Sequence, residues 1–141
     1  MMFQEDRGAG SSPLEEHQCF WLLEQKGLGR VAVSVGALPA VFPVSYEMLD
    51  GDIFFLTGEG TKLAAAVRRT PVAFEVDEFD VGSRCWGWSV LAVGHAEPLD
   101  TTEMDSVVRE LSLLQRFGLE PRNQVIRVRP EFLSGQRIDF P

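Results

Sequence analysis

A glycine-rich loop between an apolar stretch and a helix-forming stretch carries the clearest chemical signal in the chain. The loop is the segment 57–62, which reads TGEGTK. Glycine lets a backbone turn sharply and approach a ligand closely, and a helix start offers unpaired N–H groups and a partial positive charge. Thr61 adds a hydroxyl and Lys62 a full charge, so the loop suits a phosphate group. In the plainer alternative, Thr61 only caps the helix and Lys62 is solvated.

A proline inside an extended stretch is the second candidate feature. Segment 42–46 reads FPVSY. Because proline has no N–H to donate to a sheet, Pro43 marks a sheet edge or a break in strand pairing. Backbone groups at Val44 and Ser45 can then hydrogen-bond the polar edge of a flat heteroaromatic ring. The alternative is an edge proline that only protects against aggregation.

Aromatic and titratable side chains give weaker signals. Segment 86–89 (WGWS) fits a wall for a bound ring, but equally a core or subunit contact. We expect His17 in solvent on a helix. We expect His95 to be a structural residue in a strand, and the alternative is a contact of His95 with a ligand. These two histidines, taken with Cys19 and Cys85, show no zinc-ligand spacing.

Two arginines share one face of a predicted strand. Arg127 and Arg129 alternate with Val128, and alternate residues of a strand point to the same side. We interpret the pair as charge that faces solvent. The alternative is a basic face turned toward a ligand.

The hydrophobic periodicity predicts the elements that position these residues. Alternating, β-branched stretches predict strands at residues 29–35, 39–49, 53–57, 72–77, 86–97 and 124–129, the last closed by Pro130. Helices are predicted at residues 12–26, 58–69 and 100–117. Ser12 would cap the first helix, with Glu15 three residues later, and Asp100 would cap the third.

Short turns between strands decide the fold class. Asp50-Gly51 supplies the positive φ angles of a type I′ hairpin, and Gly36-Ala37 forms another turn. Parallel strands cannot be joined by such short connections, which disfavours a doubly wound parallel sheet. We therefore predict a mainly β (α+β) chain, a six-stranded antiparallel barrel with flanking helices.

The composition is that of one soluble globular domain. The chain has 141 residues, of which 45% are hydrophobic and 24% charged. We expect a flexible tail at residues 1–11 and a single domain at 12–141. The net charge of −8 argues against nucleic acid or an anionic membrane as a partner. Two widely spaced cysteines and the lack of an apolar leader predict a cytoplasmic protein.

The order of these segments resembles the pyridoxamine 5′-phosphate oxidase-like family of flavin-binding split β-barrels, in particular its small single-domain members. The resemblance covers residues 14–138 and rests on four stretches: GRVAVSV, PAVFPVSY, DIFFLTGEGTKLAAAVRRTPVAFEVD and GWSVLAVGHAE. Its best single marker is the strand that leads through GTK into a helix. The resemblance implies a split barrel that works as a homodimer, with FMN in two equivalent clefts between the subunits.

The resemblance also assigns roles to individual residues. The glycine-rich loop would hold the phosphate, and the strand end before it would lie near the ribityl chain. The proline-containing strand would line the isoalloxazine ring, and the tryptophan-containing strand would reach the cofactor from the partner subunit. The implied cofactor-binding residues are Pro43, Val44, Ser45, Thr57, Gly60, Thr61, Lys62, Trp88 and Ser89.

The chain departs from the family pattern in two places. Where the oxidase has Phe-Trp-Gln-Gly and then Arg-x-His, this chain has FLSG at 132–135 and no histidine after Arg137. This difference argues against pyridoxamine phosphate as the substrate. Val93 precedes Gly94 where many relatives carry a basic residue, so one phosphate or substrate contact is lost.

The resemblance predicts an FMN-binding oxidoreductase that transfers hydride through flavin to an unidentified small substrate. It leaves three alternatives open. The first is a deazaflavin-dependent reductase, since some relatives bind a deazaflavin and others haem. The second is a flavin-binding module that stores or senses flavin without turnover. The third is a dimeric interaction protein with the same fold and no cofactor.

Overall fold

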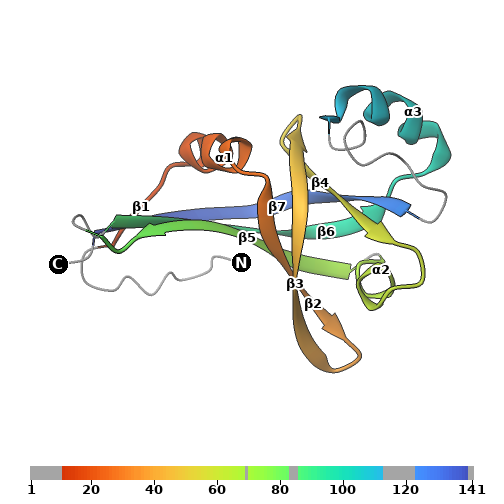
Figure 1. The fold of residues 1–141 in the computed structure, drawn as a ribbon, viewed down its shortest axis with the longest axis horizontal. Coiled ribbons are helices and arrows are strands. Elements are labelled where there is room, and N and C mark those ends of the chain that lie inside the picture. Colours follow the sequence, from red (N-terminus) through yellow and green to blue (C-terminus); the bar gives the residue numbers. More distant parts are fainter. Residues whose placement is uncertain (1–10, 69, 83–85, 113–122, 140–141) are drawn as a thin grey trace.

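An antiparallel sheet that closes on itself forms the body of the molecule (Figure 1). The computed structural model describes residues 11–68, 70–82, 86–112 and 123–139. The strands are β1 (Ser11–Pro13), β2 (Leu28–Val35), β3 (Leu38–Leu49), β4 (Asp52–Gly58), β5 (Thr70–Asp80), β6 (Trp86–Pro98) and β7 (Asn123–Asp139). The sheet order is β1-β7-β4-β3-β2-β5-β6, and β6 also pairs with β7. Strands β2 to β7 therefore close a six-stranded barrel, as predicted, and β1 is added to β7.

Alternation of side chains across the strands builds the barrel interior. Val31 and Phe74 are fully buried partners on β2 and β5, and Phe55 and Ile126 are fully buried partners on β4 and β7. The residues between them on each strand face outward, as the twofold period of a strand requires. The apolar side chains that point inward thus meet in one core.

The predicted β3–β4 hairpin is confirmed. Asp50 and Gly51 have φ angles of 52° and 82°, and both central residues of a type I′ turn need positive φ. In Figure 1 this hairpin stands between two of the helices, with α1 on one side and α3 on the other. The three helices are α1 (Glu16–Gln25), α2 (Lys62–Ala66) and α3 (Thr101–Glu110).

The predicted start of the first helix is wrong. Ser11–Pro13 is a strand paired with β7, and the backbone N–H of Leu14 continues this pairing by donating to the carbonyl oxygen of Gly135 at 2.9 Å. The helix is capped instead by Glu15 and Gln18, whose side chains and backbone N–H groups bond reciprocally. Glu15 therefore acts as the cap itself rather than as the capping partner of Ser12.

The third helix begins as predicted and ends earlier than predicted. Asp100 caps it by accepting a hydrogen bond from the backbone N–H of Glu103 at 2.8 Å. The last helical residue is Glu110, and Leu111 is extended. Residues 113–122, where the predicted end falls, lie outside the described residues. α3 packs on the outside of the barrel through a separate apolar cluster that contains Phe54 and Leu111.

The prediction that Pro130 ends the last strand is also wrong, since β7 runs on to Asp139. The β6–β7 register shifts between Val93 and Gly94, which leaves Glu131 as an extra residue opposite β6. A β-bulge of this kind is one of the places where a sheet accepts proline. The bulge has no room for a side chain at Gly94, because a Cβ there would clash with the carbonyl oxygen of Arg129 at 1.9 Å.

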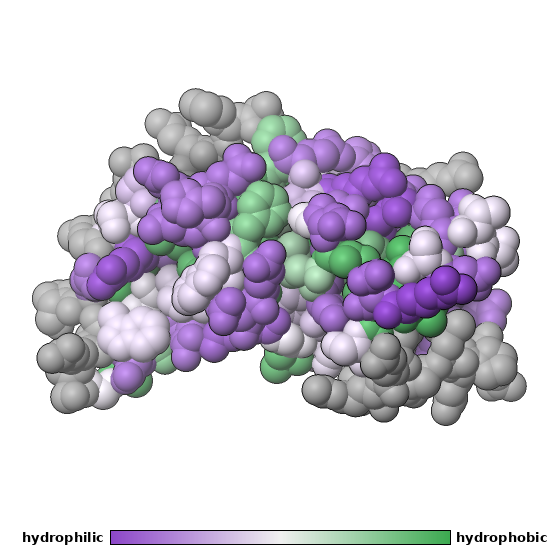
Figure 2. Space-filling view, turned by 90° about the horizontal axis from the view of Figure 1, so that it is seen from above, coloured by the Kyte–Doolittle hydropathy of each residue, from purple (hydrophilic) through white to green (hydrophobic). Residues whose placement is uncertain are grey.

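The face seen from above carries mostly hydrophilic side chains, and hydrophobic side chains show through near its middle (Figure 2). α1 and α3 lie on this side of the barrel. Among the described residues, no helix has the length and apolar character needed to cross a membrane.

Candidate functional site

Hydrogen bonds fix the loop between β4 and α2 on both of its sides. The hydroxyl oxygens of Thr57 and Thr61 lie 3.1 Å apart. The Thr61 hydroxyl donates to the carbonyl oxygen of Gly58 at 2.9 Å and accepts from the backbone N–H of Ala64 at 3.0 Å. Thr57 is buried, whereas Thr61 is exposed. The loop is therefore a preformed turn that presents its outer side to solvent.

Gly60 is required by the shape of this turn. Its φ angle is +79°, a conformation that side chains with a Cβ rarely adopt. No atom lies within 4 Å of the position that a Cβ would take. Glycine is thus needed for backbone conformation, and the space beside it is open.

Side chains supply the positive charge at the loop. α2 has only five residues, so its aligned peptide dipoles add less than the sequence argument assumed. Lys62 and Arg68 are both exposed. Neither has a carboxylate within ion-pair distance in the part of the chain that the structure describes. Two unneutralised cations on one short segment favour an anionic ligand there.

A cavity of about 250 Å³ opens beside the loop. It is lined by Gly60, Thr61, Ala64, Ala65, Arg68 and Gln124. The side-chain oxygen of Gln124 is buried and has no hydrogen-bond partner, although buried polar atoms are nearly always paired. Gln124 comes from β7, where it stands opposite Thr57 of β4. An acceptor that needs a donor therefore lines the cavity.

The structure assigns two cavity residues that the sequence interpretation missed. Arg68 could have been found, because residues 61, 64, 65 and 68 follow the spacing of one helix face. Gln124 gave no such signal, since only the pairing of β4 with β7 brings it to the loop. Lys62, which the sequence placed at the site, borders the loop but does not line the cavity.

The proline-containing strand has one unpaired edge, as the sequence predicted. Residues 38–45 of β3 pair with β2, and β3 pairs with β4 only from Tyr46 onward. Pro43 lies in the half of β3 that has a single described neighbour. The side chains of Pro43 and Ser45 are exposed, whereas Val44 is buried in the core. Val44 can therefore meet a ligand only through its backbone.

The tryptophan-containing strand lies at a different cavity. Trp88 is buried, and the ammonium nitrogen of Lys26 lies 6.0 Å from its ring centroid. With Trp21 and Trp86 it lines a largely apolar cavity of about 480 Å³ under α1. This cavity shares no lining residue with the one beside the loop. One copy of the chain thus leaves Trp88 and its neighbour Ser89 apart from the loop.

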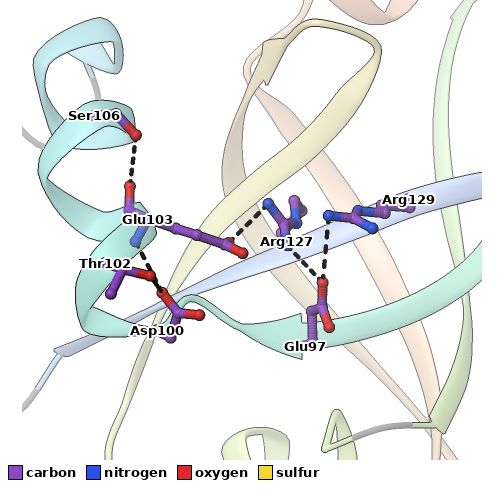
Figure 3. A network of polar contacts seen from close by, with 7 residues as sticks. All are labelled: Glu97, Asp100, Thr102, Glu103, Ser106, Arg127 and Arg129. Carbon is purple, nitrogen blue, oxygen red and sulfur yellow. Dashed lines mark hydrogen bonds and ion pairs between the residues drawn. The ribbon is translucent and has the colours of Figure 1, made fainter.

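Arg127 corrects the interpretation of the arginine pair. It is buried rather than solvent-facing: its guanidinium nitrogens lie 2.6 Å from a Glu97 oxygen and 2.9 Å from a Glu103 oxygen (Figure 3). The hydrogen bond from Arg127 holds the pKa of Glu97 below its usual value. Arg129 is exposed, 3.8 Å from Glu97. Alternation placed both on one face, but α3 covers Arg127 from outside, and the pair forms no ligand-facing surface.

The remaining reactive candidates carry no site. His17 is exposed, as predicted, and His95 is an exposed residue that contacts Glu131. Cys19 is buried in the core, and Cys85 lies outside the described residues. No group of histidine, cysteine and acidic side chains within the described ranges could hold a metal ion.

Comparison with known proteins agrees with this fold. The family model of pyridoxamine 5′-phosphate oxidase matches residues 15–137. The uncharacterized protein Rv0080 of Mycobacterium tuberculosis is 32% identical over 130 residues, which cover 89% of this chain and 84% of that protein. The structure of an FAD binding protein from Mycobacterium smegmatis is 32% identical, with a TM-score of 0.73, over 91% of this chain and 98% of that one.

A more distant structure shares the fold. An FAD-binding protein from Mesorhizobium loti is 22% identical and has a TM-score of 0.73, over 92% of this chain and 99% of its own. The match to the family model spans β2 to β6 and all but the last two residues of β7. With its six-stranded split barrel, the chain belongs to the pyridoxamine 5′-phosphate oxidase family.

Proposed function

We propose that the chain binds FMN by its phosphate at Gly60, Thr61 and Lys62, and that it works as a flavin-dependent oxidoreductase on a small substrate. The loop carries this proposal. It combines a turn fixed by two threonine hydroxyls with Lys62, and Arg68 follows at the far end of α2; neither cation has an ion-pair partner among the described residues. The 32% identical relative from Mycobacterium smegmatis, an FAD binding protein, supports a flavin as the ligand.

The residues present fit the anionic tail of a flavin. Charge-assisted hydrogen bonds from Lys or Arg to phosphate are among the strongest that proteins make, and Lys62 and Arg68 stand at the two ends of the short helix α2. The Thr61 hydroxyl can turn its proton from Gly58 toward a phosphate oxygen without losing its bond from Ala64. The same loop accepts the phosphate of a deazaflavin, which is the alternative cofactor.

A second copy of the chain completes the proposed site. The unpaired edge of β3 would offer the backbone of Val44 and Ser45 to the polar edge of the ring. Trp88 lines a separate cavity of its own chain, which supports a contact of Trp88 and its neighbour Ser89 with this ring from a partner subunit. We therefore propose a homodimer with two equivalent sites between the subunits.

The protein's own part in the chemistry is binding and placement. A bound flavin supplies hydride transfer. Lys62 and Arg68 would neutralise the phosphate of the flavin. β3 would position the isoalloxazine ring against the tryptophan of the partner subunit. An apolar wall with a few backbone groups excludes water from the ring and leaves one side for substrate.

A flavin store or sensor is the second candidate, and one observation favours it. The loop cavity is lined by no aspartate, glutamate, histidine, cysteine or tyrosine among the described residues. A general acid or base is therefore missing at this end of the site. A catalyst would have to take its proton from solvent.

The absorbance spectrum of the freshly purified protein tests the proposal. A flavin spectrum, with release of FMN on denaturation, is the expected result, and a deazaflavin or haem gives a different spectrum. A colourless protein that takes up no added FMN overturns the proposal. Turnover of a reduced nicotinamide with an acceptor then separates the oxidoreductase from the store, and the mass in solution tests the homodimer.

A further inference from the structure

The cavity under α1 is large enough for a whole small molecule. It measures about 480 Å³, and pockets that enclose a small ligand measure about 300–1,000 Å³. α1 forms one wall, and the start of β6 and the end of β7, which pair there, form the other (Figure 1). Most of the lining is apolar. The cavity therefore suits a compact ligand with a large apolar part.

All three tryptophans of the chain line this cavity. Trp86 and Trp88 stand two residues apart on β6, so their side chains leave the same face of the strand. Trp21 comes from α1 and is 59% exposed, so its ring is open to a ligand. Aromatic rings stack favourably on such side chains. The lining therefore favours a flat, conjugated ligand.

The charge of the lining favours an acid. Its titratable residues are Arg137 and His17, both basic, and no aspartate or glutamate lines it among the described residues, although the chain has 21 acidic residues and 13 lysines and arginines. Arg137 stands opposite Trp88 in the β6–β7 pairing, which brings a guanidinium beside the aromatic wall. The planar guanidinium matches the geometry of a carboxylate.

Arg137 can exchange its present partner for a ligand. Its Nε lies 3.7 Å from an Asp139 oxygen, beyond the range of a hydrogen bond, and both side chains are exposed. Exposed ion pairs contribute little, so a ligand carboxylate can displace Asp139 at small cost. Lys26 also lies near Trp88, but it is already paired with Glu78 at 2.7 Å. Arg137 is therefore the cation that an acid in this cavity would meet.

We propose that this cavity binds a flat, conjugated carboxylic acid, with its rings among the tryptophans and its carboxylate on Arg137. In the proposed function, Trp88 lies against the flavin ring of the partner subunit, so a molecule in this cavity lies beside that ring. The acid is then the small substrate of the oxidoreductase. Its role as substrate rests on the proposed function, whereas its binding does not.

Calorimetric titration of the flavin-loaded protein with 2-naphthoate and with 2-naphthamide tests the binding. Both probes offer the same flat rings, and only 2-naphthoate carries a negative charge. We expect 2-naphthoate to bind at least about tenfold more tightly, because it adds a charge-assisted hydrogen bond to the same ring contacts.

Two variants separate the charge from the rings. Arg137→Gln should lower the affinity for 2-naphthoate about tenfold and leave that for 2-naphthamide within about twofold. Trp21→Ala should weaken both probes by the same factor of about five, because it removes aromatic surface and no charge. Arg109→Gln is the matched control, an exposed arginine on α3 that does not line the cavity, and it should change neither affinity. Arg137 and Trp21 are exposed, so we expect both variants to fold, and thermal melting checks this.

The absorbance of the bound flavin tests the role as substrate. An aromatic molecule beside the isoalloxazine ring perturbs the absorbance of that ring. 2-Naphthoate should therefore shift the flavin bands of the wild type and, at the same subsaturating concentration, shift those of Arg137→Gln much less. Binding of 2-naphthoate with no change in the flavin bands would overturn the assignment of the acid as substrate.

Four results would overturn the binding itself. One is equal affinity of the wild type for the two probes, and another is an equal effect of Arg137→Gln and Arg109→Gln. The third is binding of 2-naphthoate to the flavin-free protein alone, which would mean that the flavin ring occupies the cavity. The fourth is dissociation of a dimer by the probe, which would mean that a second copy of the chain occupies it. Failure of the proposed function is distinct from these results, because the protein would then take up no flavin while the two probes still distinguish the wild type from Arg137→Gln.

Discussion

The hydroxyl oxygen of Thr57 lies 3.1 Å from that of Thr61, and this contact joins the end of β4 to the cap of α2. The same Thr61 oxygen also bonds the loop and the first turn of the helix. One side chain thus sets both the local stability of the loop and the shape of the proposed phosphate site.

Replacement of Thr61 should separate these two roles. Thr61→Ala removes the cap, and we expect it to lower the free energy of unfolding by about 1 kcal/mol. Thr61→Ser keeps the hydroxyl and should stay within about 0.5 kcal/mol of the wild type. Urea denaturation measures both. If Thr61→Ala is as stable as the wild type, the hydroxyl does not hold the loop.

Lys62 should contribute to ligand affinity and not to folding. It is exposed and forms no ion pair with the described residues. Lys62→Ala should weaken FMN binding by about 1.5–3 kcal/mol, because it removes one charge-assisted hydrogen bond to phosphate. Fluorescence titration measures the loss.

Riboflavin, which lacks the phosphate, is the matched control for this change. Its affinity should be the same for the wild type and for Lys62→Ala. An equal loss for FMN and riboflavin would contradict a phosphate contact, and unchanged FMN affinity would remove Lys62 from the site.

Glu75 on β5 should make the stability of the protein fall as pH rises toward neutrality. Burial raises the pKa of Glu75 to about 7, with a further rise from the hydrogen bond and charge of Asp77, while Arg30 opposes the shift. The unfolded pKa is about 4.3, so between these two values the folded state holds more protons than the unfolded state. The contribution of Glu75 to the free energy of unfolding is therefore fully present below about pH 4.3, and it is lost as the pH rises through about 7.

Urea denaturation at a series of pH values tests this window with two variants. Glu75→Gln cannot ionise, so its stability should lack the loss between about pH 4.3 and 7. Asp77→Asn removes the like charge beside Glu75, so the loss should move to lower pH. A wild-type profile identical to that of Glu75→Gln would show that Glu75 titrates normally.

Local patterns were sufficient for the strands and for the loop. Alternation predicted β2 to β6 to within a few residues, and Asp50-Gly51 identified the hairpin because the turn needs two positive φ angles. Thr61 and Gly60 were found for the same reason, since a cap and a sharp turn have local sequence signatures.

Features that depend on distant segments could not be predicted. Ser12 has a capping pattern, yet pairing with Arg137 on β7 makes it a strand residue. Gln124 reaches the cavity only through the β4–β7 register. Tertiary contacts override local propensity in such places, and a single sequence carries no signal for them.

α3 covers Arg127 and leaves Arg129 exposed, a difference that strand alternation alone does not predict. Strand alternation gives Arg127 and Arg129 the same outward direction, but Glu103 of α3 reaches over the first and not the second. The side chain of Arg127 is 10% exposed and that of Arg129 is 60% exposed. The two arginines therefore offer a matched pair for measuring what an arginine contributes when a helix covers it.

We expect Arg127→Met to lower the free energy of unfolding by about 1–3 kcal/mol, because it leaves Glu103 without its cation and Glu97 with only the longer contact to Arg129. Arg129→Met should cost less than about 0.5 kcal/mol, as exposed ion pairs do. Urea denaturation of both variants decides between them. Equal effects would mean that the contacts of Arg127 with α3 do not stabilise the fold.

The loss of stability at acid pH gives a second test of the contact between Arg127 and Glu97. The hydrogen bond from Arg127 lowers the pKa of Glu97, so this contribution is present above the unfolded pKa of about 4.3 and is lost as pH falls through the folded value. Arg127→Met should reduce this loss more than Arg129→Met does, because the hydrogen bond from Arg127 is the main cause of the lowered pKa of Glu97 and the charge of Arg129 a smaller one. Methionine cannot bond either carboxylate. If Arg127→Met lost stability at acid pH as the wild type does, groups other than Glu97 would cause that loss.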